Sequence, residues 1–328
     1  MSINVSIIIP SAGRRSDLLK RAIKSALIND KDIKAEILVI LNGEKGTFFD
    51  VSKAYQHPSV RYYKINEGNV SKARNFGLSI ASGDLIRFLD DDDYLIKEVA
   101  YLQYIELFQS KAELSTYSGD IRDDYKTYQK VVPVYPMDYY TAVLSSKCPA
   151  LTFATVYKSS LIKNLMWDEN LSFMEDENWM RSIAYKKITS WITSHDVVGV
   201  WYQHQYGRLS ISIGSNDFYK YRAVSILKLV DHLQKNNIFN ESRQKSAALG
   251  LWSAAHGGFP FDPIYWIKIS KIARDFDINS HPEIELFKKL YFLNPIILEC
   301  LLIPLRKINR LFRILKNKIF GSPFLRSI

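Results

Sequence analysis

The sequence predicts an α/β protein with a doubly wound, mostly parallel sheet, helices on both faces and a helical appendage at the C-terminal end. Three observations predict this fold class. Short apolar runs alternate with amphipathic helical stretches through the first third of the chain, which is typical of parallel strands joined by crossovers. One of these runs, Leu85–Leu89, ends directly in four aspartates, Asp90–Asp93. From Asp217 onward the hydrophobic pattern is helical.

The first strands and helices follow from β-branched residues, caps and turns. Val5–Pro10 is rich in isoleucine and closed by a proline, which favours a strand. Asp17 is the expected N-cap of the next helix, whose apolar face includes Leu19 and Ile23. We expect further strands at 35–41, 60–65 and 85–89, a turn at Asn42-Gly43 and a helix from Val70 to Gly83.

The second half of the predicted sheet is less regular. We expect helices at 98–110 and 175–185, and strands at 113–121, 150–157 and 197–202. The tyrosine-rich segment 123–149 shows no clear period and receives no assignment. A serine- and glycine-rich stretch, Gly207–Asn216, marks the expected boundary, so that residues 1–212 form one domain and residues 213–328 form the helical region.

The composition indicates a packed globular protein of a reducing compartment. The chain has 328 residues, of which 47% are hydrophobic, and this is enough for a packed core. Its two cysteines, Cys148 and Cys300, form no CxxC pair, which favours a reducing compartment. The chain enters its first strand directly after Met1-Ser2 without a basic segment or a cleavage site, so we expect no signal peptide.

The run Asp90–Asp93 is the expected functional centre. Adjacent carboxylates repel one another, and solvent or a cation relieves that repulsion. Mg²⁺ and Mn²⁺ prefer oxygen ligands, often one or two carboxylates together with substrate phosphates. An open α/β sheet binds its ligands outside the carboxyl ends of its strands, which is where these acids stand. A solvated acidic turn before a helix would give the same pattern.

Four segments together resemble glycosyltransferase family two, whose fold is GT-A. They are Val5–Pro10, similar to the family's opening strand; Asn69–Leu78, similar to G-V-S-x-A-R-N-x-G; Phe88–Asp93, similar to F-L-D-x-D-D; and Trp167–Trp179, similar to F-D-E followed by E-D-x-x-W. Each motif is short, but all four stand in the family's order within residues 5–212. The resemblance implies a nucleotide-sugar half at about residues 1–95 and an acceptor half at about residues 96–212.

The resemblance also implies catalytic and metal-binding roles. Asp176 would be the general base of an inverting transfer that forms a β linkage, with Glu175 as the alternative base or as an acceptor contact. Acids at the start of a helix also complement the helix dipole, which is the structural alternative. A Mn²⁺ or Mg²⁺ ion would be held by Asp92, with Asp90 and Asp93 helping directly or through water. His204 is a further candidate for contact with the metal or with phosphate.

The donor is expected to bind along the ends of the first strands. The residues assigned to it are Pro10, Ser11, Asn42, Asn69, Lys72, Arg74, Asp90, Asp91 and Arg208. Lys72 and Arg74 stand at a helix start, which favours anions, although Lys72 equally fits a solvated basic face. The family's acidic turn after the second strand is replaced here by Leu41-Asn42-Gly43-Glu44, and Asn42 can hydrogen-bond a base edge.

The C-terminal tail is strongly basic. From Arg306 onward the chain carries seven basic residues and no acid, which accounts for most of its net charge of +10. Apolar residues recur between them at helical spacing, so we expect an amphipathic helix at about residues 305–320 that lies on an anionic membrane surface. A helix packed on the catalytic domain would show the same spacing. The expected location is peripheral, on the cytoplasmic face of the bacterial inner membrane.

The resemblance and the tail together lead to one expected function. The protein would move a hexose or N-acetylhexosamine, with glucose or galactose favoured, from a UDP-sugar to a polyprenyl-diphosphate-linked saccharide during O-antigen or capsule assembly. The alternative is a sugar-nucleotide nucleotidyltransferase, but Pro10–Arg15 resembles a glycine-rich phosphate loop only faintly, and Glu175 and Asp176 would then have no role. Nucleic acid is not expected as a partner, because the acidic cluster would repel a polyanion.

Overall fold

The computed structural model describes residues 2–28, 30–43, 55–66, 68–125, 127–131, 138–204 and 215–320. The chain separates into two compact units. The first comprises Met1–Val143 and Pro149–His204, and the second comprises Leu144–Cys148 and Gln205–Ile328. The short segment Leu144–Cys148 therefore belongs to the second unit, although the chain on both sides of it belongs to the first.

The first unit contains the predicted strands and helices in the predicted order, together with several short elements that were not predicted. Its strands are β1 (Ile3–Ser11), β2 (Ile33–Leu41), β3 (Val60–Lys64), β4 (Leu85–Phe88), β5 (Tyr94–Leu95), β6 (Leu114–Arg122), β7 (Thr127–Val131), β8 (Thr155–Lys158) and β9 (Trp191–Tyr202). Its helices are α1 (Ser16–Ala26), α3 (Val70–Ile80), α4 (Lys97–Gln109), α5 (Tyr139–Leu144), the 3₁₀ turn η1 (Thr152–Ala154), α6 (Ser159–Ile162) and α7 (Glu175–Ile183).

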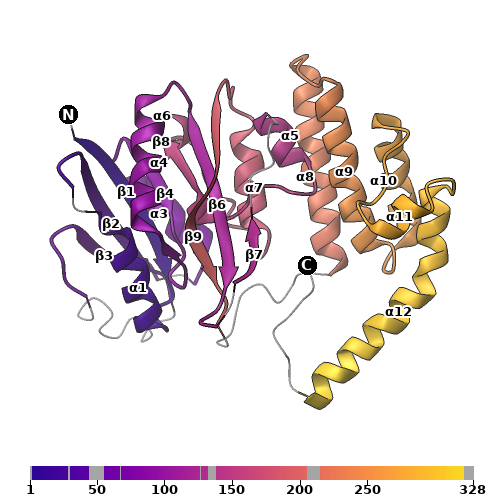
Figure 1. Ribbon diagram of the computed structural model, residues 1–328, viewed down its shortest axis with the longest axis horizontal. Helices are drawn as coiled ribbons and strands as arrows, with labels where there is room; N and C mark the ends of the chain where they lie inside the picture. Colours follow the sequence, from indigo (N-terminus) through magenta and orange to yellow (C-terminus); the bar gives the residue numbers. More distant parts are fainter. Residues whose placement is uncertain are drawn as a thin grey trace. The chain divides into compact units, whose positions relative to one another are not determined.

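Nine strands of the described chain form one sheet, in the order β3-β2-β1-β4-β8-β6-β9-β5, with β7 paired to β6 (Figure 1). Strands β3, β2, β1 and β4 are parallel to one another, and β6 is parallel to β9. Strand β8 is antiparallel to both of its neighbours. The chain order reverses at β1, which has β2 on one side and β4 on the other, and open α/β sheets bind ligands at such a point.

Both faces of β1 are buried, which explains its continuous apolar sequence. Val5, Ile7 and Ile9 point to one face and belong to the same core as buried side chains of α1 and α4. Ile8 points to the other face, where α3 approaches closely: a Cβ on Gly77 would lie 2.4 Å from Ile8 Cγ2. Helices on both faces of a mixed, mostly parallel sheet confirm the predicted fold class.

Several local boundaries differ from the sequence prediction, and three of the differences are informative. Helix α1 begins at Ser16 with Arg15 at its N-cap, so Asp17 lies in the first turn and complements the dipole instead of capping the helix. Within the predicted strand 150–157, Thr152–Ala154 form a buried 3₁₀ turn, and the strand begins only at Thr155. Strand β9 begins well before residue 197, because its polar first half pairs with β6.

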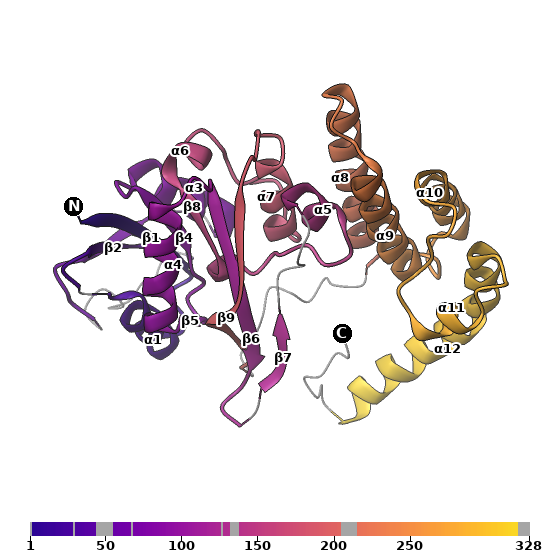
Figure 2. The same ribbon diagram turned by 45° about the horizontal axis from the view of Figure 1, so that its top comes forward.

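The second unit is helical. It contains α8 (Asn216–Lys235), α9 (Glu241–Gly258), α10 (Pro263–Phe276), α11 (Glu285–Lys289) and α12 (Pro295–Phe320). Helix α9 packs against both α8 and α10 (Figure 2). The inserted segment also contacts α9, since a Cβ on Gly250 would lie 2.0 Å from the Leu144 carbonyl oxygen. Only glycine permits so close a backbone approach.

Helix α12 is attached to α9 through one buried carboxylate. Glu299 is fully buried; His256 Nδ1 of α9 lies 2.5 Å from its Oε1, and Arg306 donates to its Oε2 at 2.9 Å. The helix is continuous through Pro304 and therefore starts before the tail expected at 305–320. Among the helices that the structure describes, none combines the length and the apolar character needed to cross a membrane.

Candidate active site

The candidate site lies at the carboxyl ends of β1, β2 and β4. Because β1 and β4 are parallel, with Ile8 opposite Phe88, the segments that follow them emerge at one edge of the sheet. Ser11 Oγ donates a hydrogen bond to Asp91 Oδ2 at 2.5 Å. The backbone N–H of Asn42 donates to the Ser11 carbonyl at 2.9 Å. The predicted donor-binding residues of two loops are thus joined to the acidic run.

Asp91 and Asp92 share one guanidinium group. Arg15 donates from Nη2 to Asp91 Oδ1 at 2.8 Å and from Nη1 to Asp92 Oδ2 at 2.6 Å. His204 Nε2 lies 2.9 Å from the same Asp92 oxygen and 2.6 Å from Arg15 Nη1. Arg21 donates to the Asp92 carbonyl at 2.9 Å. Two cations from the start and middle of α1 therefore face the acidic run.

The two paired carboxylates differ in their ionisation. Asp91 is buried, and this burial raises its pKa to about 6 against the opposing charge of Arg15. Burial also acts on Asp92, but the hydrogen bond with His204 and the charge of Arg15 outweigh it and lower the pKa of Asp92. Asp92 is therefore the permanent anion of the pair, whereas Asp91 takes up a proton below about pH 6.

Arg74 of α3 joins two predicted motifs that are distant in sequence. Its side chain is 1% exposed, and the guanidinium donates from Nη2 to Asp90 Oδ1 at 2.8 Å and from Nη1 to Asp176 Oδ1 at 3.0 Å. Glu175 Oε1 lies 4.0 Å from Arg74 Nη1. Burial opposes the charge of Arg74, but the three carboxylates raise its pKa. The positive charge is therefore permanent.

The same cluster changes the acidity of Asp176. Burial raises the pKa of Asp176 well above the ordinary aspartate range. The charge of Arg74 opposes this shift, while the negative charges of Glu175 and Asp90 add to it. A carboxylate with a raised pKa accepts a proton more readily than an ordinary aspartate does, which is the property required of a general base.

Two asparagines of α3 hold the segment that leads to Asp176. Asn75 accepts from the backbone N–H of Trp167 at 2.8 Å and donates to the Trp167 carbonyl at 3.0 Å. Asn69 caps α3 by accepting from the N–H of Lys72 at 3.0 Å, and it donates to the Glu169 carbonyl at 2.8 Å. The asparagines of the N-V-S-K-A-R-N motif thus connect α3 to the fourth motif.

The start of α7 is fixed by backbone and aromatic contacts. Met174 has φ 60°, a left-handed conformation that non-glycine residues rarely adopt, and it directly precedes Glu175 at the first position of the helix. Trp167 and Trp179 stack with ring centroids 4.5 Å apart. The guanidinium of Arg74 lies 4.2 Å from the centroid of Trp167. The orientation of Asp176 is thus determined by a packed framework.

Asp92 and His204 are the residues that best fit a divalent cation. A carboxylate oxygen and an imidazole nitrogen are both accepted by Mn²⁺, and these two atoms converge on one point. Asp90 is engaged with Arg74, and Asp93 Oδ1 accepts from the Tyr202 N–H at 3.0 Å. Within the described ranges no three His, Cys, Asp or Glu side chains could enclose an ion. Donor phosphates would have to complete its coordination, as is usual for Mg²⁺.

Several residues fall outside the sequence prediction or outside the described ranges. Pro10 lies within β1, opposite Ile40 of β2. Arg208 belongs to a segment outside the described residues. Arg15 and Thr152 also contact the acidic run, and neither was predicted as a site residue. Thr152 Oγ1 donates to Asp90 Oδ2 at 3.3 Å. The sequence offered no spacing or motif that links either residue to the acids.

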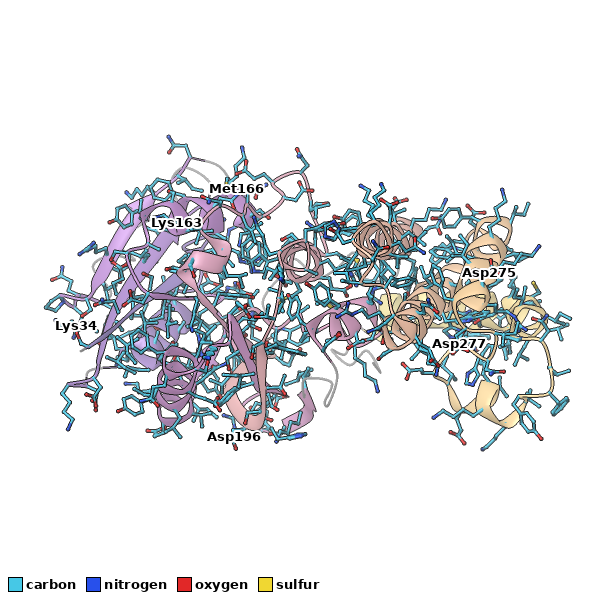
Figure 3. All side chains as sticks on the ribbon, turned by 90° about the horizontal axis from the view of Figure 1, so that it is seen from above. Lys34, Lys163, Met166, Asp196, Asp275 and Asp277 are labelled. Atoms are coloured by element: carbon cyan, nitrogen blue, oxygen red, sulfur yellow. The ribbon has the colours of Figure 1, made fainter. Side chains whose placement is uncertain are left out.

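An open cavity of about 180 Å³ lies at the other ends of the strands. Its lining includes Asn4, Lys34, Glu36 and Arg61; Lys34 is labelled at the outer edge of the first unit in Figure 3. None of the residues that line it was predicted for the site. Parallel sheets bind ligands at the carboxyl ends of strands, so we place the candidate site at the acidic run and not in this cavity.

Comparisons with known proteins agree on one family. Residues 6–168 match the family described as Glycosyl transferase family 2. The chain is 25% identical over 186 residues to "Minor teichoic acid biosynthesis protein GgaB" of Bacillus subtilis (strain 168), covering 52% of this chain and 20% of that protein. It is 24% identical over 151 residues to "Glycosyltransferase GlyA" of Streptococcus pneumoniae serotype 4, covering 40% of this chain and 21% of that protein. The matches thus span about a fifth of each relative.

Solved structures share the fold. S. aureus TarS 1–349 in complex with UDP-GlcNAc superposes with a TM-score of 0.57 at 14% identity, covering 85% of this chain and 91% of that chain. The mannosyltransferase PcManGT of Pyrobaculum calidifontis, in complex with GDP-Man and Mn²⁺, gives a TM-score of 0.51 at 15% identity, covering 92% and 87%. These likenesses show the GT-A fold.

Proposed function

Because the chain belongs to glycosyl transferase family 2, we propose that it is an inverting glycosyltransferase that uses a nucleotide-sugar donor. The observation that carries this proposal is the pair of hydrogen bonds from Arg74 to Asp90 and Asp176. One buried cation holds the acid that follows β4 and the acid at the start of α7 in a fixed relation. The donor side and the acceptor side of a transfer site need such a relation, because the two reactants must be aligned.

In the proposed reaction Asp176 removes the proton of an acceptor hydroxyl. The hydroxyl oxygen forms a bond to the anomeric carbon of the donor while the bond from that carbon to the diphosphate breaks. The nucleoside diphosphate leaves with the electron pair, and a single displacement inverts the anomeric centre. The raised pKa of Asp176 supports its role as the proton acceptor. Glu175, which lies on the same turn, is the alternative base.

The leaving diphosphate needs positive charge. A divalent cation, when bound by Asp92 and His204, would stabilise the charge that develops on the leaving phosphate. Arg15 and Arg21 supply further positive charge beside the acidic run. Ser11 and Asn42 stand at the strand ends where the nucleoside of the donor would bind. This set of residues favours a diphosphate donor over a nucleic acid.

For the substrates we propose a class of donor and a class of acceptor. A UDP-sugar donor is supported by the TarS complex with UDP-GlcNAc. For the transferred sugar we propose an N-acetylhexosamine, glucose or galactose. For the acceptor we propose a polyprenyl-diphosphate-linked saccharide of a bacterial surface polymer, such as an O-antigen or capsule repeat unit. The name of GgaB, which refers to minor teichoic acid, adds polymers of that kind to the class.

A lipid-linked acceptor fits a second proposal, that α12 lies on the membrane surface. Ile297, Leu301, Leu305, Ile308 and Phe312 are all exposed, and at 3.6 residues per turn they fall within an arc of about 80°. Glu299 and Arg306, which attach α12 to α9, lie on the opposite side of the helix. The apolar arc therefore points away from its own unit, as an interfacial helix requires.

The experiment that tests the proposed reaction is release of nucleoside diphosphate from a panel of donors. UDP-glucose, UDP-galactose, UDP-GlcNAc and GDP-mannose would each be tested with Mn²⁺ or with a chelator, and with or without a lipid-diphosphate sugar acceptor. We expect one UDP-sugar to give release that needs the metal and increases with the acceptor. Asp176→Asn should reduce transfer by about 10²-fold or more and leave donor binding intact. Asp92→Asn should weaken donor binding.

Two results would contradict the proposal. Release from none of the donors by the folded protein, together with no donor binding by calorimetry, would exclude a nucleotide-sugar site at the acidic run. Equal donor affinity in Asp92→Asn and Asp176→Asn would contradict the division of roles between the two acids.

A further inference from the structure

Arg15 stands where a divalent cation would bind, and we propose that this guanidinium is a resident cation that is exchanged for the metal when the donor arrives. The inference rests on the proposed function, because it assumes that the site takes a metal and a diphosphate. The inference assigns Arg15 a role in the order of binding. Without donor, Arg15 excludes metal ions from the site; when the donor binds, Arg15 moves away and a metal ion can bind.

The geometry of three atoms carries the inference. Arg15 Nη1, His204 Nε2 and Asp92 Oδ2 form a triangle with sides of 2.6, 2.9 and 2.6 Å. His204 Nε2 can accept a hydrogen bond from Arg15 or donate one to Asp92, but one nitrogen cannot do both. One contact of the triangle is therefore always unfavourable. A metal ion in place of the guanidinium would resolve this conflict, because Nε2 and Oδ2 can both donate electron pairs to it.

Two of the groups that hold Arg15, Asp92 and His204, are those that the metal would engage, and the Arg15 side chain is not enclosed. Its side chain is 24% exposed, in contrast to Arg74 at 1%. Its partners are Asp91, Asp92 and His204, and the first of these is also held by Ser11. Displacement of Arg15 would thus leave Asp91 with the hydrogen bond from Ser11 as its remaining side-chain contact within the described part of the chain. The guanidinium itself would need a new anion.

The donor diphosphate can supply that anion. Arginine pairs with phosphate oxygens through two parallel hydrogen bonds, as it does with carboxylates. A diphosphate beside the acidic run would draw Arg15 away from Asp92 and would also complete the coordination of the metal. Donor and metal should therefore bind with positive coupling. By linkage, the factor by which donor increases metal affinity equals the factor by which metal increases donor affinity.

The test measures Mn²⁺ binding without any transfer reaction. The free Mn²⁺ signal in electron paramagnetic resonance would be titrated with wild-type protein and with Arg15→Gln, first without nucleotide and then with saturating UDP. We expect Arg15→Gln to bind Mn²⁺ alone about tenfold more tightly than wild type, and UDP to increase its Mn²⁺ affinity by a smaller factor. Arg14→Gln is the matched control, because Arg14 is exposed and adjacent in sequence. It should behave as wild type.

An equal or weaker affinity of folded Arg15→Gln for Mn²⁺ alone would overturn the inference, since removal of a competing cation must strengthen metal binding. Thermal melting of each variant establishes that the protein is folded. The inference and the proposed function can be told apart: UDP release by wild-type protein with Mn²⁺, together with unchanged Mn²⁺ affinity of the Arg15→Gln variant, would retain the transferase and exclude the exchange.

Discussion

Two arginines organise the acids of the site in different ways. Arg74 is sealed within the first unit and is stacked on Trp167, so its carboxylate partners are held in place. Arg15 is partly exposed and reaches Asp91 and Asp92, which are 76 and 77 positions away along the chain. The sequence motif indicated Arg74, but no pattern indicated Arg15. Pairing at such separation depends on the sheet register, which places the ends of β1 and β4 together.

The environment of Asp176 makes a prediction about pH. If Asp176 is the base, the specificity constant should increase with pH as this carboxyl loses its proton, and the midpoint should lie above the aspartate value of about 4. Glu175→Gln removes a neighbouring negative charge that raises the pKa of Asp176, so it should move this limb to lower pH. The measurement is kcat/KM for transfer between about pH 5 and 9.

The control for this profile is Asp168→Asn, which removes an acid eight positions before Asp176 in the chain. Among the described residues, its side chain accepts a local hydrogen bond from the N–H of Asn170 at 3.0 Å. Its profile should coincide with that of wild type. A limb that stays at the same pH in Glu175→Gln would show that the titrating group is not electrostatically linked to Glu175, and Asp176 would lose its assignment as the base.

At the scale of elements, the sequence predicted best where one physical signal acted alone. Strands β1, β2 and β4 are buried on both faces, so their apolar runs were unambiguous. Strand β9 was found only in part, because its first half is polar and is specified by pairing with β6. The segment containing β7 and α5 has no clear hydrophobic period in its sequence. Its structure depends on tertiary contacts, such as the hydrogen bond that the Tyr139 hydroxyl donates to the Met180 carbonyl at 2.7 Å.

The contact between α3 and β1 predicts that replacement of Gly77 by alanine destabilises the protein. Alanine in a helix is favoured over glycine by about 1 kcal/mol, but its Cβ would overlap Ile8, which is completely buried. Overpacking of this kind costs about 1–3 kcal/mol, so we expect Gly77→Ala to lower the free energy of unfolding by about 1 kcal/mol net. Urea denaturation of the full chain measures the change.

Gly68→Ala is the matched control for that experiment. A Cβ at this position would have its nearest neighbour at 3.7 Å, the Asn42 carbonyl oxygen, which is an ordinary contact. The change in stability should remain within about 0.5 kcal/mol. If Gly77→Ala were as stable as Gly68→Ala, then α3 could move away from β1, and the explanation given for the glycine of this motif would be wrong.

At the scale of the whole molecule, the basic C-terminal region was predicted from charge and spacing, but its attachment was not. The pairing of Glu299 with His256 and Arg306 decides which side of α12 faces α9. The hydropathy pattern contains no information on that pairing, because an acid within an apolar run is as compatible with solvent as with a buried partner. The rotation of α12 about its axis determines which apolar residues are exposed, and the sequence alone does not specify that rotation.

The apolar arc of α12 predicts how the protein binds lipid vesicles. Leu301→Glu together with Phe312→Glu places two charges in the arc, and each lost apolar contact weakens binding by about 1.5–3 kcal/mol. We expect the double variant to sediment with phosphatidylglycerol vesicles at least tenfold less than wild type. Ile264→Glu is the control, because Ile264 is equally exposed but lies on α10. Equal sedimentation of all three proteins would exclude α12 as the lipid contact.

The placement of Leu144–Cys148 has a consequence for how such a protein can change over generations. The second unit is encoded in two separate stretches of the gene, one short and one long. A single recombination event near codon 205 would exchange the long stretch and leave the short one behind. Leu144 would then face a different α9, which need not have a glycine at the position of Gly250. We therefore expect exchange of the helical unit to preserve this contact only when both stretches are exchanged together.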